Sequence, residues 1–234
     1  GNVLQQMGKL DEALTKYGEV LCIQEKVLGP EHRVVADTQN NIAIVFRHQG
    51  KYTEALEMYH KALQTREKVL GPDHPDVARA YNNIGIVYAK QAKYPEALEV
   101  YQKSLDIKVK VYGPDHLDEA RTKVNIAAAL FQQAKHQEAL EMWSAALNVL
   151  ERDLGHEHPL VARTYNNICI VYKEQAKYPE AIEMYQKSLD IKIKVLGPEH
   201  PSVADTKVCP TTCESCVSAH ESVLFVPLHS GRHR

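Results

Sequence analysis

GPDHPDVARAYNNIGIVYAKQAKYPEALEVYQKSLDIKVKVY, residues 71–112, is the stretch that decides the fold. A second Gly-Pro-Asp-His follows at Gly113, and close relatives of this tetrapeptide begin at Gly29, Gly155 and Gly197, always 42 residues apart. A fixed period of about 20 to 50 residues is typical of proteins that are built from stacked repeats. The sequence therefore predicts a repeat architecture and not a single globular core.

Each 42-residue unit contains two runs of apolar residues at helical spacing, here at 77–88 and 97–105, with a break at 91–94. Gly71 suits the left-handed position that ends a helix, and Pro75 suits the first turn of the next helix, where a missing N–H costs nothing. Neither helix can bury its apolar face alone. We therefore expect each unit to be a pair of helices that packs against its neighbours.

The 42-residue period also predicts how the whole chain is divided into repeats. Gly1 falls on Gly85 two periods later, so the pattern begins inside a first helix. At the other end, Cys209 replaces the asparagine of the earlier repeats, and Pro210 interrupts the helix. We expect a truncated first repeat at 1–28 (mainly its second helix), complete repeats at 29–70, 71–112, 113–154 and 155–196, the start of an interrupted repeat at 197–208, and an irregular, disordered tail at 209–234. Because the pattern starts and stops inside an element, we also expect a fragment or an incomplete gene model.

Composition excludes several classes of function. The chain has 234 residues, of which 44% are hydrophobic and 25% charged, and its formal net charge is −2. Basic and acidic residues alternate along the repeats, which argues against a nucleic-acid binder that depends on phosphate contacts. The apolar runs fall short of the roughly 18 residues of a membrane span. We therefore expect no nucleic acid, no membrane insertion and a cytoplasmic location.

The sequence carries no recognisable catalytic motif. The glycines stand singly at helix ends and form no phosphate-binding loop, and the GxSxG and HExxH patterns are absent. We therefore expect no enzymatic activity and no cofactor.

Histidine and cysteine are the candidate metal ligands of the sequence. Five histidines recur once per repeat: His32, His74, His116, His158 and His200. Packed helices lie about 8–10 Å apart, whereas metal ligands must approach one ion to about 2 Å. These histidines are therefore expected to pack at helix starts. Cys209, Cys213, Cys216 and His220 have near-metal spacing, but they provide one CxxC pair without a scaffold, so we expect reduced thiols and no metal site.

Two polar columns on the first helices are the candidate site. One column contains asparagines: Asn41, Asn83, Asn125 and Asn167, next to Asn40, Asn82 and Asn166. Asparagine is a poor helix former, so its repetition requires a compensating hydrogen bond, either to a neighbouring repeat or to the backbone of a bound peptide. The other column, four residues earlier, contains Asp37, Arg79, Arg121, Arg163 and Asp205. Its arginines can pair with Asp76 and Asp118 three residues before them, or they can bind an acidic or phosphorylated ligand.

The repeats resemble the tetratricopeptide repeat, whose pattern is met by Ile84-Gly85, Tyr88, Ala97 and Tyr101. The usual unit has about 34 residues, and the additional residues lengthen the second helix. The NNIA/NNIG, KY-x-EAL-x-x-Y and VLGP-[DE]-HP-x-VA elements make residues 1–208 similar to the repeats of kinesin light chains. This resemblance implies an all-α, right-handed superhelix of antiparallel helix pairs, a tetratricopeptide-type α-solenoid, whose inner face is lined by the first helices.

The resemblance also implies a partner, because the groove of kinesin light chains takes up acidic cargo peptides. The carboxylate clamp of other family members requires asparagine where this chain has Ile44, Ile86, Ala128 and Ile170, which argues against a chaperone peptide. We expect a peptide-binding groove formed by Asn41, Arg79, Asn82, Asn83, Arg121, Asn125, Arg163, Asn166 and Asn167. The expected function is a non-enzymatic scaffold that binds an extended acidic peptide as a cargo adaptor, with a kinesin motor complex as a further partner. The alternatives are a self-associating structural scaffold and the repeat region of a signalling protein.

Overall fold

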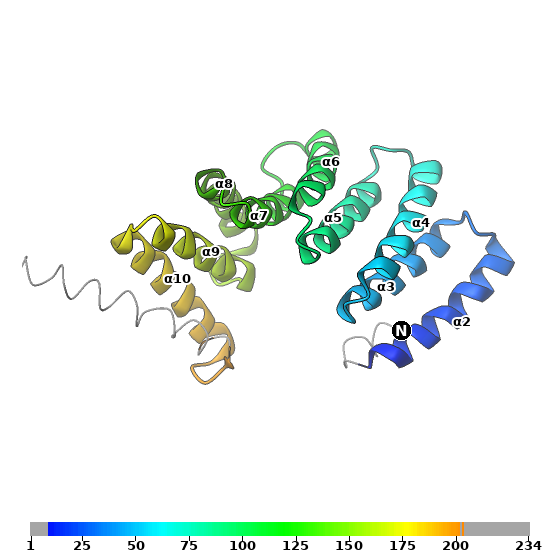
Figure 1. Ribbon diagram of the computed structural model, residues 1–234, viewed down its shortest axis with the longest axis horizontal. Coiled ribbons are helices and arrows are strands. Elements are labelled where there is room, and N and C mark those ends of the chain that lie inside the picture. The colour runs from blue at the N-terminus through cyan, green and yellow to red at the C-terminus, as the bar shows by residue number, and fades with distance from the viewer. Residues whose placement is uncertain (1–8, 202, 204–234) are drawn as a thin grey trace, which may run out of the picture. The chain divides into compact units, whose positions relative to one another are not determined.

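The structure is a computed structural model that describes residues 9–201 and residue 203. Every regular element of this part of the chain is an α-helix, and shorter and longer helices alternate (Figure 1). The helices are α2 (Leu10–Leu28), α3 (Arg33–His48), α4 (Tyr52–Leu70), α5 (Pro75–Lys90), α6 (Tyr94–Tyr112), α7 (Leu117–Gln132), α8 (His136–Leu154), α9 (Pro159–Glu174) and α10 (Tyr178–Leu196). The all-α prediction is confirmed.

The chain divides into two compact units, Gly1–Met142 and Trp143–Arg234. In the first unit, each helix from α2 to α7 packs against the next one along the chain, and α5 also contacts α7. In the second unit, α9 packs against α10. The predicted repeat boundaries stay a prediction. Residues 1–8 of the truncated repeat, residues 202 and 204–208 of the interrupted repeat and the tail at 209–234 lie outside the described residues.

The first helices begin at the recurrent histidines. In α3, α5, α7 and α9 the Nδ1 atom of this histidine accepts a hydrogen bond from the backbone N–H two residues later, as His74 does from Asp76 at 3.1 Å. This bond satisfies one of the backbone donors that every helix start leaves open. The second helices end at glycines instead, and Gly71 has a φ of 86°, a conformation that glycine adopts without strain. The predicted roles of the histidines and of Gly71 are confirmed.

The core consists of small and aromatic residues that the helix pairs bring together. Ala55, Tyr59, Val77 and Ile84 are fully buried in one cluster of α4 and α5. At Gly85 the helices α5 and α6 approach closely, because a Cβ atom at this position would lie 2.5 Å from Cε1 of Tyr101 on α6. Such contacts fix the position of each first helix against the second helix of its repeat. They therefore also fix which side of the first helices the polar columns occupy.

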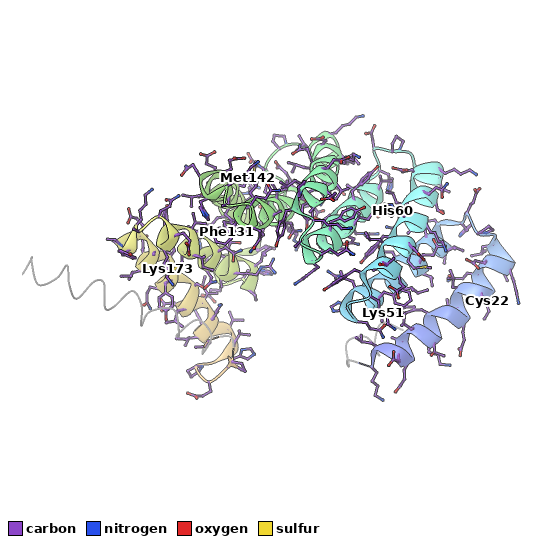
Figure 2. All side chains as sticks on the ribbon, in the orientation of Figure 1. Cys22, Lys51, His60, Phe131, Met142 and Lys173 are labelled. Atoms are coloured by element: carbon purple, nitrogen blue, oxygen red, sulfur yellow. The ribbon has the colours of Figure 1, made fainter. Side chains whose placement is uncertain are left out.

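Two further properties of the described chain bear on function. Cys22 is an exposed thiol on α2 (Figure 2), whereas Cys169 on α9 is buried. Within residues 9–201 and 203, none of the helices is both long enough and apolar enough to span a bilayer.

Candidate functional site

Asparagine side chains join neighbouring first helices within the first unit. Nδ2 of Asn83 on α5 donates to Oδ1 of Asn40 on α3 at 3.1 Å, and Nδ2 of Asn125 on α7 donates to Oδ1 of Asn82 on α5 at 3.0 Å. Asn40 is buried, and the other three are half-buried. The sequence left two alternatives for the asparagines, a hydrogen bond to a neighbouring repeat or one to a bound peptide. These two bonds are of the first kind. Each amide still has further hydrogen-bonding positions, because it offers two donor hydrogens and an acceptor oxygen.

The column that contains Asn40 and Asn82 has no asparagine in α7. Val124 takes the place of Asn40 and Asn82 in α7, so this position offers no amide. In the second unit, Asn166 and Asn167 lie half-buried on α9. Asn41 on α3 is also half-buried.

The arginines of the second column are exposed on α5, α7 and α9. Nη2 of Arg79 lies 2.9 Å from Oδ1 of Asp76, whereas Nη1 of Arg121 lies 3.8 Å from Oδ1 of Asp118. Arg163 has Leu160 three residues before it and so lacks this intrahelical carboxylate. The predicted intrahelical pairs therefore form at two positions, and the pair of Arg121 is the looser of the two.

Buried cations lie beneath the first helices, and sequence reasoning missed them. Arg66 on α4 is only 1% exposed, and its Nη2 donates to Oδ1 of Asp37 at 2.8 Å. One repeat later Lys108 on α6 is 8% exposed, but the residue equivalent to Asp37 is Arg79. The sequence does contain a signal for these cations. The position is basic in two successive repeats, at Arg66 and Lys108, whereas the equivalent residue of the next repeat is the apolar Leu150.

Lys108 has a hydroxyl partner. Its Nζ donates to Oγ1 of Thr122 at 2.6 Å. Burial lowers the pKa of Lys108 to about 8; the nearby Asp118 opposes this change, and Arg121 adds to it.

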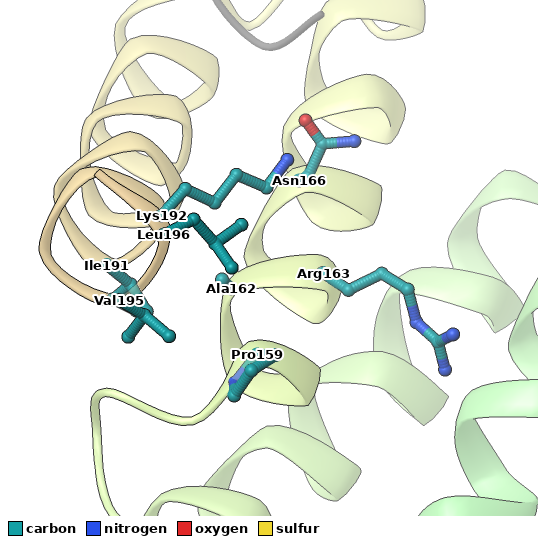
Figure 3. Close-up of a pocket in the computed structure, with 8 residues that line it drawn as sticks. All are labelled: Pro159, Ala162, Arg163, Asn166, Ile191, Lys192, Val195 and Leu196. Carbon is teal, nitrogen blue, oxygen red and sulfur yellow. The ribbon is translucent and has the colours of Figure 1, made fainter. Parts of the chain in front are cut away.

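The second unit contains a cavity of about 250 Å³ between α9 and the end of α10. It is lined by Pro159, Ala162, Arg163, Asn166, Ile191, Lys192, Val195 and Leu196. Figure 3 shows the Lys192 side chain extending toward Asn166, while the guanidinium of Arg163 points away from α10. The lining combines apolar side chains with the Asn166 amide and the Lys192 ammonium, which suits a carboxylate side chain attached to an apolar segment.

The described residues provide no group of three or more His, Cys, Asp or Glu side chains that could hold a metal ion. The cysteines and histidine of the predicted tail, Cys209, Cys213, Cys216 and His220, lie outside the part that the structure describes.

Comparison with known proteins identifies the repeat. The family model of the tetratricopeptide repeat matches residues 1–48, 34–110, 87–142, 118–194 and 164–207. No curated protein matches the chain.

Three solved structures are similar in fold. A kinesin light chain-like protein of Podospora anserina with nearly identical TPR-like repeats is 23% identical, with 83% of this chain and 92% of that chain covered and a TM-score of 0.67. BtubC (BKLC) from P. vanneervenii is 17% identical over 100% and 98% of the two chains, with a TM-score of 0.69. The apo form of RapI is 16% identical over 95% and 82%, with a TM-score of 0.77. The chain belongs to the tetratricopeptide repeat family.

Proposed function

We propose that the chain is a non-enzymatic scaffold of the cytoplasm that binds an extended acidic segment of a partner protein on its first helices. Tetratricopeptide repeats generally bind protein partners. The finer assignment is a kinesin-light-chain-like cargo adaptor, with a kinesin motor complex as a further partner. The peptide-binding residues are Asn41, Arg79, Asn82, Asn83, Arg121, Asn125, Arg163, Asn166 and Asn167.

The observation that carries this proposal is the change of charge in one column of the first helices. Asp37 in α3 neutralises the buried Arg66, but Arg79, Arg121 and Arg163 take its place in the next three first helices. All three arginines are exposed, and Arg121 has a loose carboxylate partner at 3.8 Å. An incoming carboxylate can pair with such a guanidinium through two parallel hydrogen bonds.

The asparagines supply the second element of peptide recognition. Asn83 and Asn125 each use one donor hydrogen in a cross-repeat bond, which fixes the orientation of the amide. The remaining donor and acceptor positions can bind the N–H and C=O groups of an extended backbone. Backbone contacts of this kind hold a peptide of any sequence, so the arginines would select for acidic side chains.

Charge reversal at Arg121 tests the proposal. A fluorescein-labelled peptide of alternating Glu and Leu should bind the wild-type chain in fluorescence anisotropy, and added salt should weaken binding because the contacts are exposed to solvent. Arg121→Glu should weaken binding by about tenfold or more, since one charge-assisted hydrogen bond contributes roughly 1.5–3 kcal/mol.

The matched control is Lys61→Glu, which makes the same change of charge at an exposed position on α4, away from the two polar columns. It should leave peptide affinity unchanged, and both variants should keep the wild-type circular dichroism spectrum. Equal affinity of wild type and Arg121→Glu, or equal binding of a Lys-Leu peptide, would rule out the acidic-peptide proposal.

A further inference from the structure

A second cavity of the second unit, of about 370 Å³, lies over α9, α10 and the turn before α9. It is lined by His156, Glu157, Tyr165, Lys187, Asp190, Ile191 and Lys194. None of the residues that we assign to peptide binding is in this lining. Tyr165 and Ile191 provide apolar surface, and the other lining side chains are polar or charged. The cavity therefore combines an apolar wall with charged groups, as binding sites commonly do.

The tyrosine of this cavity is held in place from two sides. The hydroxyl of Tyr165 donates a hydrogen bond to a carboxylate oxygen of Glu151 on α8. Nζ of Lys187 on α10 lies 5.6 Å from the centroid of the Tyr165 ring. The same Nζ atom lies 2.7 Å from Oε1 of Glu183, so this lysine already has a carboxylate partner.

The aspartate of the cavity differs from its other carboxylates. Glu157 forms an ion pair with Lys194. Asp190, which is exposed, accepts a hydrogen bond from Nε2 of Gln186 at 2.6 Å and has no basic partner among the described residues. Two lysines therefore stand beside four carboxylates, and the excess of negative charge includes an aspartate that is open to a ligand.

The same arrangement occurs 84 residues earlier, in the first unit. The hydroxyl of Tyr81 donates to Oε1 of Glu67 at 2.8 Å, and Nζ of Lys103 lies 5.9 Å from the centroid of the Tyr81 ring. Asp106 accepts from Nε2 of Gln102 at 2.7 Å and is likewise exposed. The full set is Glu67, Asp73, Tyr81, Glu99, Lys103, Asp106, Ile107 and Lys110. Two separate units therefore build one surface from equivalent residues.

The other two complete repeats lack both the tyrosine and the unpaired aspartate. Their equivalents are Gln39 and Gln64 in the repeat at 29–70, and Lys123 and Asn148 in the repeat at 113–154. All four repeats nevertheless form a short and a long helix with the same boundaries. The helix pair therefore does not require this tyrosine and aspartate, which occur together or not at all.

We propose that each of these two surfaces binds an arginine side chain of a partner protein. The unpaired aspartate, Asp190 or Asp106, accepts two parallel hydrogen bonds from the guanidinium. The alkyl stem of the arginine packs on Ile191 or Ile107 beside the tyrosine ring. Arginine fits better than lysine, because a planar guanidinium makes the paired bonds that an ammonium group does not.

This surface selects for the opposite charge to that of the arginine column on the first helices. Its excess of carboxylates attracts a cationic segment and repels an acidic one. The chain would thus hold an acidic segment on one set of residues and a basic segment on another. The two proposals rest on different residues, so either one can fail without the other.

An NMR titration of the ¹⁵N-labelled chain with the peptide acetyl-Gly-Arg-Gly-amide tests the inference. The amide signals of residues 187–194 and 103–110 should shift and reach saturation. The same peptide with citrulline, which has nearly the shape of arginine but no charge, should bind about tenfold more weakly or worse. Asp190→Asn should weaken binding at residues 187–194 by about tenfold and leave the response of residues 103–110 unchanged, and Asp106→Asn should do the reverse.

The matched control is Glu141→Gln on α8. Glu141 is exposed and accepts from Nε2 of Gln137, four residues before it, at 3.0 Å, as Asp190 does from Gln186. This variant should bind the arginine peptide like the wild type at both surfaces. Equal binding of the arginine and citrulline peptides, or unchanged binding at residues 187–194 in Asp190→Asn, would overturn the inference. Shifts of the same signals by a Glu-Leu peptide would overturn it as well, whereas shifts of the first helices by that peptide test the acidic-peptide proposal alone.

Discussion

At the scale of single residues, Lys108 shows what one exchange of charge does to a packed repeat. The equivalent Arg66 is buried against Asp37, whereas Lys108 is buried with a hydroxyl partner, Thr122, and has Asp118 and Arg121 nearby. A buried charge whose direct hydrogen-bond partner is not a carboxylate is costly. Its ammonium group therefore favours the unfolded state, in which water solvates it, and this explains why burial lowers its pKa to about 8.

Lys108→Met should stabilise the chain at neutral pH. A pKa that falls from 10.5 to about 8 on folding corresponds to about 3 kcal/mol against the folded state while the amine is charged, and loss of the Thr122 bond offsets part of the gain. The sign follows from the lowered pKa: the cost is complete below pH 8 and disappears as pH rises from 8 to 10.5. Urea unfolding should give Lys108→Met an advantage of about 1–3 kcal/mol at pH 7 and little at pH 10.5.

The control for this prediction is Lys103→Met on the same helix. Lys103 is exposed and pairs with Glu99 at 2.7 Å, so its loss should change stability by less than about 0.5 kcal/mol at either pH. A lower stability of Lys108→Met at pH 7 would show that the hydroxyl contact outweighs the desolvation of the ammonium.

At the scale of the helices, asparagine bonds couple α3 to α5 and α5 to α7. Asn83→Ala should cost about 1–2 kcal/mol of unfolding free energy, because Asn40 is buried and loses its donor. The double variant Asn40→Ala/Asn83→Ala should cost less than the sum of its parts, with a coupling of at least about 0.5 kcal/mol in denaturant unfolding.

Asn41→Ala provides the comparison, since Asn41 stands in the same column but takes part in neither of the two cross-repeat bonds. Removing it should cost nothing and should gain a few tenths of a kcal/mol from helix propensity. Strict additivity of Asn40→Ala and Asn83→Ala would mean that the 3.1 Å contact contributes no stability.

At the scale of the whole molecule, stacked repeats transmit a perturbation mainly to their neighbours. Gly85→Ala places a Cβ atom 2.5 Å from the buried ring of Tyr101, so it should destabilise its own helix pair by about 1–3 kcal/mol through overpacking. Hydrogen exchange should accelerate in α5 and α6 and in the helices that contact them, α4 and α7, and stay unchanged in α9 and α10.

Gly18→Ala is the matched control, because Gly18 lies in α2 and its added Cβ would have no atom within 4 Å apart from its chain neighbours and the backbone of its own helix. It should stabilise α2 by about 0.5–1 kcal/mol, the helix propensity difference between glycine and alanine. Uniform acceleration over all helices in Gly85→Ala would indicate that the chain unfolds as one cooperative body and not repeat by repeat.

The sequence by itself determined the repeat, the helix pairs and their ends. It did so because these features depend on local signals: apolar spacing within a helix, a histidine two residues from the N–H that it accepts, and a glycine such as Gly71 where the backbone turns left-handed. It also identified the residue types of the candidate site, because a fixed period places equivalent residues on equivalent faces.

Only the tertiary structure decided the partners of those residues. Asn83 bonds to Asn40, 43 residues away, and Arg66 to Asp37, 29 residues away, while Lys108 finds no acid at the equivalent place. A hydrogen bond forms or fails over less than 1 Å, whereas a repeat pattern fixes position only to a face of a helix. Which asparagines bridge repeats and which cations are buried therefore followed from the packing of helices that lie far apart in the chain.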